Sequence, residues 1–400
     1  MPDDDAAAAP PPSSDRPADP PAADRTTALG GGRPGGGAPA VSYAALDLGT
    51  NNCRLLIGAP TGAGFRVVDS FSRIVRLGEG LAATGRLSEA AMDRALAALA
   101  ACADKLGRRP VRRLHAVATE ACRRAANGAA FLARVGAETG LRPRVISARE
   151  EAELAMESCA PLLEEEDRRA LLFDIGGGST EIAWIRVPPR HARGPGRPQA
   201  ELIGTVSLPL GVVTLAERAG DSCFTQRGFE AVVDEVEAHL RAFDAVHCIG
   251  QEIRGGGVRL IGTSGTVTTL AGVVLALPRY RRPLVDGRRL DAGAADQALG
   301  ELFALGRAGL AAHPCVGPDR VEFVLPGCAI YAAIRRVWPV PTLTVADRGL
   351  REGMLLRMIR ADRYPAAADR PWGGRDPRRA APAAAAAPMP PPPRRHPDGP

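Results

Sequence analysis

A short apolar strand that ends in an aspartate and a glycine occurs twice in this chain, and this repeat constrains the fold most strongly. Asp47 ends the first such strand and Asp174 the second, and each is followed by a turn of glycine and small polar residues and by another apolar strand. Apolar runs joined by a glycine turn predict β-hairpins. Two matched hairpins indicate duplicated halves. If the halves face each other, the two turns lie on opposite walls of one cleft.

The segments around the two hairpins alternate between strand and helix patterns. Residues 88–107 have helical spacing with Ser88 as the N-cap, and residues 144–163, 258–277 and 342–362 each predict a strand followed by a helix. This alternation predicts an α/β fold.

The two ends of the chain have a different composition. Residues 1–40 and 365–400 are rich in Ala, Pro and Gly and hold few large apolar side chains. Such segments cannot bury enough apolar surface to offset the entropy lost on ordering, so we expect two disordered tails. Between them we expect two domains, residues 41–153 and 154–364, with the final helix packing back on the first domain.

The acidic start and the cysteines bear on the compartment. Asp3, Asp4 and Asp5 give the N-terminus the wrong charge for a signal peptide, and no apolar run is long enough to cross a membrane. The eight cysteines form no C-x-x-C pair and lie in apolar stretches, which indicates reduced, buried thiols. We therefore expect a cytoplasmic protein.

The charged residues favour an anionic partner. The formal net charge is +6, and Lys105 is the single lysine among the 51 cationic side chains. Arginine forks suit phosphate, although an arginine-rich composition alone does not prove such a role. No glycine turn carries the lysine that a phosphate-loop NTPase requires, which excludes that class.

Three glycine turns are candidate phosphate sites. Glycine lets backbone N–H groups approach an anion closely, and neighbouring hydroxyls add donors. The third turn leads from a strand into a helix, whose first N–H groups could bind an anion, although an ordinary loop is equally compatible. The candidate residues are Gly49, Thr50 and Asn51 in the first turn, Gly176, Gly177, Gly178, Ser179 and Thr180 in the second, and Ser264, Gly265 and Thr266 in the third.

Acidic residues beside two of these turns indicate a bridging cation. Carboxylates would repel a bare phosphate, whereas Mg²⁺ binds carboxylate and phosphate oxygens together. Asp47, Asp174 and Glu181 are the candidate metal ligands.

Two adjacent glutamates have separable roles. Ser147 and Glu150 form the pattern of a capping box, so Glu150 should fold back onto the helix start. Glu151 is then free to face a cleft and to take a proton from an attacking water.

Further charged groups follow in two polar segments. Arg123 or Arg124 could clamp a phosphoryl group, and nearby Glu120 is a reserve general base. Five arginines surround Tyr280 in residues 277–290, where they could follow a polyanion or form a solvated loop.

These motifs resemble those of the Ppx/GppA phosphatase family, the exopolyphosphatases and guanosine pentaphosphate phosphohydrolases of bacteria. The matching stretches are ALDLGTNNCRLLIG, ATEACRRAANG, ISAREEAELA, FDIGGGSTEI, LIGTSGTVTTLAG and VADRGLREGML, and together they span residues 43–359. The resemblance implies two actin-like α/β domains around a central cleft. It also implies Mg²⁺-dependent hydrolysis of a terminal phosphate.

The resemblance assigns roles to individual residues. The catalytic glutamate of the family falls on Glu151, the phosphate-contacting arginine on Arg123, and the metal and phosphate residues on Asp47, Asp174, Glu181 and the glycines between the last two. Because nothing foldable follows about Arg363, the chain resembles the short form of the family, without the HD-like C-terminal domain.

The expected activity is therefore exopolyphosphatase, with inorganic polyphosphate as substrate. Phosphate sites look alike for other substrates, so guanosine pentaphosphate (pppGpp) is the main alternative. A small-molecule kinase on the same fold and a non-catalytic polyphosphate or nucleotide sensor are lesser alternatives. No nucleic acid or membrane partner is expected, and a homodimer remains open.

Overall fold

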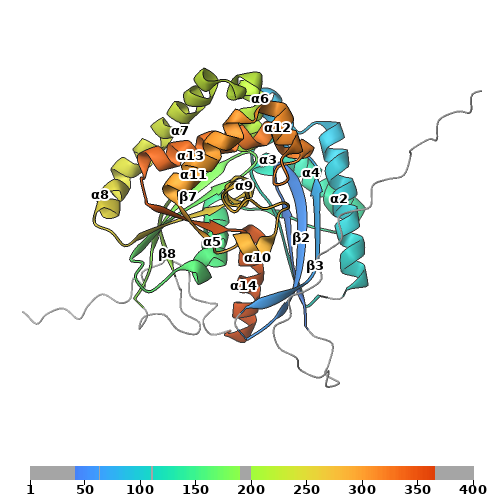
Figure 1. The fold of residues 1–400 in the computed structure, drawn as a ribbon. Helices are drawn as coiled ribbons and strands as arrows, with labels where there is room; N and C mark the ends of the chain where they lie inside the picture. The colour runs from blue at the N-terminus through green and yellow to red at the C-terminus, as the bar shows by residue number, and fades with distance from the viewer. Residues whose placement is uncertain (1–40, 63, 110, 190–199, 365–400) are drawn as a thin grey trace, which may run out of the picture. The chain divides into compact units, whose positions relative to one another are not determined.

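Two β-sheets form the framework of the protein in a computed structural model (Figure 1). The model describes residues 41–364 apart from 63, 110 and 190–199, so both expected tails lie outside the described residues. The strands are β1 Tyr43–Leu48, β2 Asn52–Pro60, β3 Phe65–Ile74, β4 Arg113–Ala118, β5 Arg144–Val145, β6 Arg169–Ile175, β7 Thr180–Arg186, β8 Glu201–Leu208, β9 Val258–Thr263, β10 Arg289–Asp291 and β11 Thr342–Ala346.

The two sheets repeat one topology. The first has the strand order β3-β2-β1-β4-β5, and the second has the order β10-β11-β9-β6-β7-β8. In the first, β1 is antiparallel to β2 and parallel to β4; in the second, β6 is antiparallel to β7 and parallel to β9. Apart from the added β10, the second sheet matches the first strand for strand. This duplication is the actin-like α/β fold, as the sequence predicted.

Helices cover the sheets and connect their strands. The α-helices are α1 Leu81–Thr84, α2 Glu89–Arg108, α3 Glu120–Arg124, α4 Gly128–Thr139, α5 Ala148–Cys159, α6 Val212–Ala219, α7 Gln226–His247, α8 Ile249–Arg254, α9 Gly265–Val274, α10 Arg282–Val285, α11 Ala292–Ala304, α12 Gly306–Ala312, α13 Val321–Val337 and α14 Leu350–Arg363. None of the described helices is long and apolar enough to cross a membrane.

Each sheet has its own hydrophobic core on its outer face. Leu46 and Leu55 of the first sheet pack with Leu99 of α2 and Phe131 of α4. On the second sheet, helices α7, α9, α11 and α13 supply the largest cluster of buried side chains, including the fully buried Tyr331. Burial of such side chains is worth about 1.5–3 kcal/mol each, so these two cores hold both sheets rigid.

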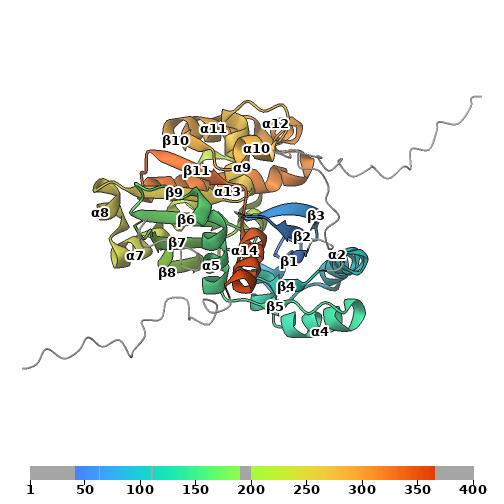
Figure 2. The same ribbon diagram turned by 90° about the horizontal axis from the view of Figure 1, so that it is seen from below.

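Two helices lie side by side between the sheets (Figure 2). α14 packs on the first sheet through Met354 and Leu355, whereas α5 packs on the second through Ala155 and Met156. The helices touch closely, because a Cβ added to Gly353 of α14 would lie 2.0 Å from the Leu154 carbonyl oxygen of α5. The last helix of the described residues is thus placed on the first sheet.

Local sequence signals are confirmed at several helix ends. Ser88 caps α2 by accepting the Ala91 N–H, and Ser147 and Glu150 form the reciprocal capping box of α5. The cysteines are free thiols, and seven are buried as expected. Cys248 is an exception: it is exposed, because it lies in a left-handed turn between α7 and α8.

Candidate active site

The turns of the two hairpins meet in space. The first hairpin, β1–β2, presents Thr50 and Asn51, and the second hairpin, β6–β7, presents Gly177 and Gly178. A Cβ added to Gly178 would lie 2.7 Å from the Thr50 Oγ1, and one at Gly177 would lie 3.3 Å from the Asn51 Cβ. Glycine is therefore required here by the close approach of another turn. The two turns face each other as predicted, but they contact one another and do not stand on opposite walls of a cleft.

These turns belong to the wall of one cleft of about 430 Å³. Most of the predicted site residues line this cleft, from elements of both sheets. They are Asp47, Gly49, Thr50, Asn51, Glu151, Asp174, Gly176, Gly177, Gly178, Ser179, Ser264, Gly265 and Thr266.

The acidic residues of the hairpins occupy equivalent positions. In the first hairpin Asp47 pairs across the strands with Arg54, and in the second Asp174 pairs with Glu181. Directly opposed residues of an antiparallel pair project on the same face. Asp47 therefore has a cation beside it, whereas Asp174 has a second acid.

Burial shapes the protonation of these acids. It raises the pKa of Asp174 to about 8, with a further contribution from Glu181. Burial also raises the pKa of Asp47, where Arg54 acts in the opposite direction. Carboxylates that are costly to ionise in the empty cleft become favourable ligands once a cation is bound.

Glu151 faces the cleft from the first turn of α5. Its side chain is 15% exposed. Burial raises its pKa well above the usual range, Glu181 adds to the effect, and Arg123 opposes it. Its neighbour Glu150 instead folds onto the Ser147 backbone N–H and contacts Arg144, which lowers its pKa to about 2. The two glutamates have the separate environments that the capping pattern predicted.

Arg123 bridges two carboxylates of the cleft wall and does not itself line the cleft. Its Nη2 lies 2.5 Å from the Glu120 Oε2, and its Nη1 lies 3.3 Å from the Glu151 Oε2. Its Nε also donates to Glu120, and its Nη1 to the Ile146 carbonyl. These contacts occupy four of the five N–H groups that a guanidinium offers.

Two further predicted residues lie behind the cleft surface. Thr180 is fully buried and its hydroxyl donates to the Leu210 carbonyl. Glu181 is 4% exposed and accepts hydrogen bonds from the hydroxyls of Ser179 and Ser207. Glu181 thereby orients Ser179, which does line the cleft.

The third turn is less open to an anion than its sequence suggests. Ser264 caps α9, and its hydroxyl already accepts the N–H groups of Thr266 and Val267. Arg320 donates to the Gly265 carbonyl at the same place, 2.7 Å away. The positive charge at this end of the cleft therefore includes an arginine side chain.

Four arginines that line the cleft were missed at the sequence level, of which Arg348 is paired with Asp286 and the other three have no such ion pair among the described residues. Arg54, Arg320 and Arg351 come from β2, from the turn before α13 and from α14. Among the described residues, none of the three has a carboxylate within 4.0 Å. Partly buried guanidinium groups whose N–H groups are not taken up by a carboxylate in direct contact favour the binding of an anion.

The arginine-rich loop also reaches the cleft. Tyr280 lines it and donates a hydrogen bond to Asp347, and Arg282 pairs with Asp347 and Glu352. Arg282 is therefore engaged in ion pairs within the protein. Tyr280 places part of this loop at the rim of the cleft.

The acidic residues fit a hard cation. Among the described side chains, no three of His, Cys, Asp or Glu come close enough to chelate an ion together. Mg²⁺ needs only one or two carboxylates when phosphate oxygens and water complete its shell. The buried Oδ1 of Asn51, which has no hydrogen-bond donor, adds an acceptor for such a shell. This donor set suits Mg²⁺.

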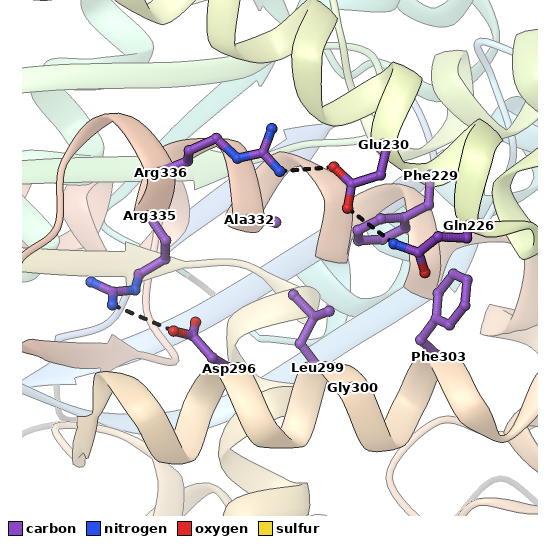
Figure 3. A pocket seen from close by; sticks show the side chains of 10 residues that line it. All are labelled: Gln226, Phe229, Glu230, Asp296, Leu299, Gly300, Phe303, Ala332, Arg335 and Arg336. Atoms are coloured by element: carbon purple, nitrogen blue, oxygen red, sulfur yellow. Dashed lines mark hydrogen bonds and ion pairs between the residues drawn. The ribbon is translucent and has the colours of Figure 1, made fainter.

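A second cavity, of about 460 Å³, lies among α7, α11 and α13 (Figure 3). Arg336 pairs there with Glu230, and Arg335 with Asp296, so its charges satisfy one another. The first cleft differs because Arg54, Arg320 and Arg351 form no ion pair within 4.0 Å among the described residues.

Known proteins place most of the described region in one family. The model of the Ppx/GppA phosphatase family matches residues 57–361. The crystal structure of the Aquifex aeolicus family member is 26% identical, with a TM-score of 0.66, and the match covers 81% of this chain and 99% of that one. An exopolyphosphatase-like protein is 27% identical with a TM-score of 0.68, covering 80% and 97%.

A third structure agrees in fold. An exopolyphosphatase from Cytophaga hutchinsonii is 23% identical, with a TM-score of 0.68, and the match covers 80% of this chain and 97% of that one. The duplicated hairpins, the shared cleft and the family model lead to one conclusion: the chain belongs to the Ppx/GppA phosphatase family.

Proposed function

We propose that the protein is an exopolyphosphatase, which releases terminal orthophosphate from inorganic polyphosphate by hydrolysis. The observation that carries the proposal is the coexistence, in one cleft, of three arginines that form no ion pair within 4.0 Å among the described residues and of Glu151 with its raised pKa. The arginines supply sites for a chain of phosphates, and Glu151 supplies a base for water.

The hairpin turns would hold the terminal phosphoryl group. Backbone N–H groups of the glycine turns are the candidate donors, because the Ser179 hydroxyl already donates to Glu181, and one N–H of Arg123 has no acceptor among the described residues. Positioning of this kind provides most of the acceleration in phosphoryl transfer.

Asp174, Asp47 and Glu181 are the residues that would hold Mg²⁺, of which the last lies just behind the cleft surface. Bound Mg²⁺ neutralises charge on phosphate oxygens. Glu151 would accept a proton from the attacking water, and its buried environment keeps the carboxylate basic enough to do so.

A second substrate, pppGpp, is favoured by one feature. Tyr280 and Phe323 line the same cleft, and an aromatic ring can stack on a nucleobase. Polyphosphate has no group that would use these rings.

Phosphate release tests the proposal. Purified protein is assayed with defined-length polyphosphate and with pppGpp, with and without Mg²⁺, alongside Glu151→Gln. We expect Mg²⁺-dependent release by the wild type and a loss in kcat of about 10²–10⁴-fold for the variant, while substrate binding persists. Undiminished turnover by Glu151→Gln would refute the assigned role, and preferred hydrolysis of pppGpp would select the second substrate.

A further inference from the structure

Arg123 joins two separate elements at the cleft. Glu120 and Arg123 are three residues apart in α3, whereas Glu151 lies in α5. The guanidinium also donates to the carbonyl of Ile146, just before α5 begins. One side chain of α3 thus contacts both the start of α5 and the carboxylate that faces the cleft.

Glu120 is the stronger of the two carboxylate partners. Its Oε2 accepts from both the Nε and the Nη2 of Arg123, at 3.1 and 2.5 Å, whereas Glu151 accepts once, at 3.3 Å. Gly178 lies close to the Glu120 side chain as well, because a Cβ added there would lie 3.2 Å from the Glu120 Cγ. It is 8% exposed.

We propose that Glu120 is a positioning residue for the hydrolysis: it holds Arg123, and through Arg123 it keeps the Glu151 carboxylate oriented on the cleft wall. This inference rests on the proposed function, in which Glu151 accepts the proton of water. It differs from a base role for Glu120, whose Oε2 is occupied by Arg123 and whose Oε1 lies 3.7 Å from Arg124.

The contacts explain why Arg123 needs this partner. Without Glu120 the guanidinium keeps only the bonds of its Nη1, and a group held through one nitrogen can rotate about it. A planar guanidinium held along its Nε and Nη2 edge has a defined orientation instead. Loss of that edge contact would leave Glu151 with a mobile partner.

Steady-state kinetics distinguish this role from substrate binding. In Glu120→Gln, kcat should fall by about 10-fold to 10²-fold, the scale for a misplaced catalytic group, with an unchanged KM. Glu120→Asp, which keeps the charge, should recover part of the loss. Glu138→Gln is the matched control: Glu138 also accepts from an arginine of its own domain, Arg134, at 2.7 Å, but at the surface. Its kinetics should equal those of the wild type.

A double variant tests whether Glu120 acts through Arg123. If it does, Glu120→Gln should cost no further activity in an Arg123→Ala background. Thermal melting of each variant establishes that it is folded.

The outcomes distinguish a failure of the proposed function from a failure of this inference alone. Wild-type protein that releases no phosphate from either substrate would overturn the proposed function and this inference together. An active wild type with an unaffected Glu120→Gln, a variant that changes KM alone, or additive losses in the double variant would overturn the inference only.

Discussion

The first hairpin sets Arg54 opposite Asp47, whereas the second sets Glu181 opposite Asp174, on the same scaffold and in the same register. The first pair is balanced in charge and the second carries two acids. Duplication therefore kept the backbone and the leading aspartate, but changed the residue across from it. The difference indicates a division of labour, in which the second hairpin supplies most of the carboxylates for the cation and the first supplies, in Arg54, a cationic group for the anion.

Removal of each aspartate should give unequal results. Asp174→Asn should lower kcat/KM by about 10²–10³-fold, the scale for losing an electrostatic stabiliser of a reacting group, and should raise the Mg²⁺ concentration needed for activity. Asp47→Asn should cost less, because Arg54 already balances that charge. Phosphate release measured over a range of Mg²⁺ concentrations gives both quantities. Equal losses with equal Mg²⁺ requirements would remove the distinction between the hairpins.

The residues opposite the aspartates should affect different quantities. Arg54→Gln should raise KM for polyphosphate by about tenfold, as expected for about 1.4 kcal/mol of lost attraction to an anion, without altering the Mg²⁺ requirement. Glu181→Gln should raise the Mg²⁺ requirement and leave KM at saturating Mg²⁺ unchanged. The same phosphate-release assays test both variants. If Arg54→Gln changed the Mg²⁺ requirement and Glu181→Gln changed KM, the roles assigned to the two hairpins would be reversed.

The cleft acids also predict how stability depends on pH without Mg²⁺. The folded chain holds a proton on Asp174 up to about pH 8, whereas the unfolded chain releases it near 3.8, so stability should fall as pH rises between these values. Each such proton contributes a slope of about 1.4 kcal/mol per pH unit. The raised pKa values of Asp47, Glu151 and Glu181 act in the same direction.

Other groups whose pKa values are shifted affect stability outside this pH range or in the opposite direction. Glu150, with a pKa of about 2, affects stability only at lower pH, and the lowered pKa of the half-buried His115 gives a contribution that is lost as pH falls below about 6.5. Urea unfolding at pH 5 and pH 8 measures the net slope. Added Mg²⁺ or the substitution Asp174→Asn should reduce the slope. If neither of them changes the slope, the account is contradicted.

The local parts of this site could be predicted from the sequence, because they depend on neighbouring residues. The hairpin turns, the capping box and the direction of Glu151 all follow from short patterns. A signal for Arg54 was also present: it occupies in the first hairpin the place that Glu181 occupies in the second. The repeat could therefore have identified it.

The remaining parts depend on tertiary structure. Arg320 and Tyr280 reach the cleft from connections far along the chain, and no local spacing indicates that position. The bond from Arg123 to Glu151 joins two elements in the same way. The direction of the Thr180 side chain also depends on tertiary structure. Its hydroxyl is of a type that suits phosphate, but in the structure it donates to the Leu210 carbonyl.

A crystal structure of Glu151→Gln with Mg²⁺ and tripolyphosphate tests the division of labour most directly. The account predicts the ion on the second hairpin, at Asp174, and phosphate oxygens within hydrogen-bond distance of Arg54. An ion bound by the first hairpin without Asp174, or a triphosphate bound outside the cleft that both turns line, would contradict it.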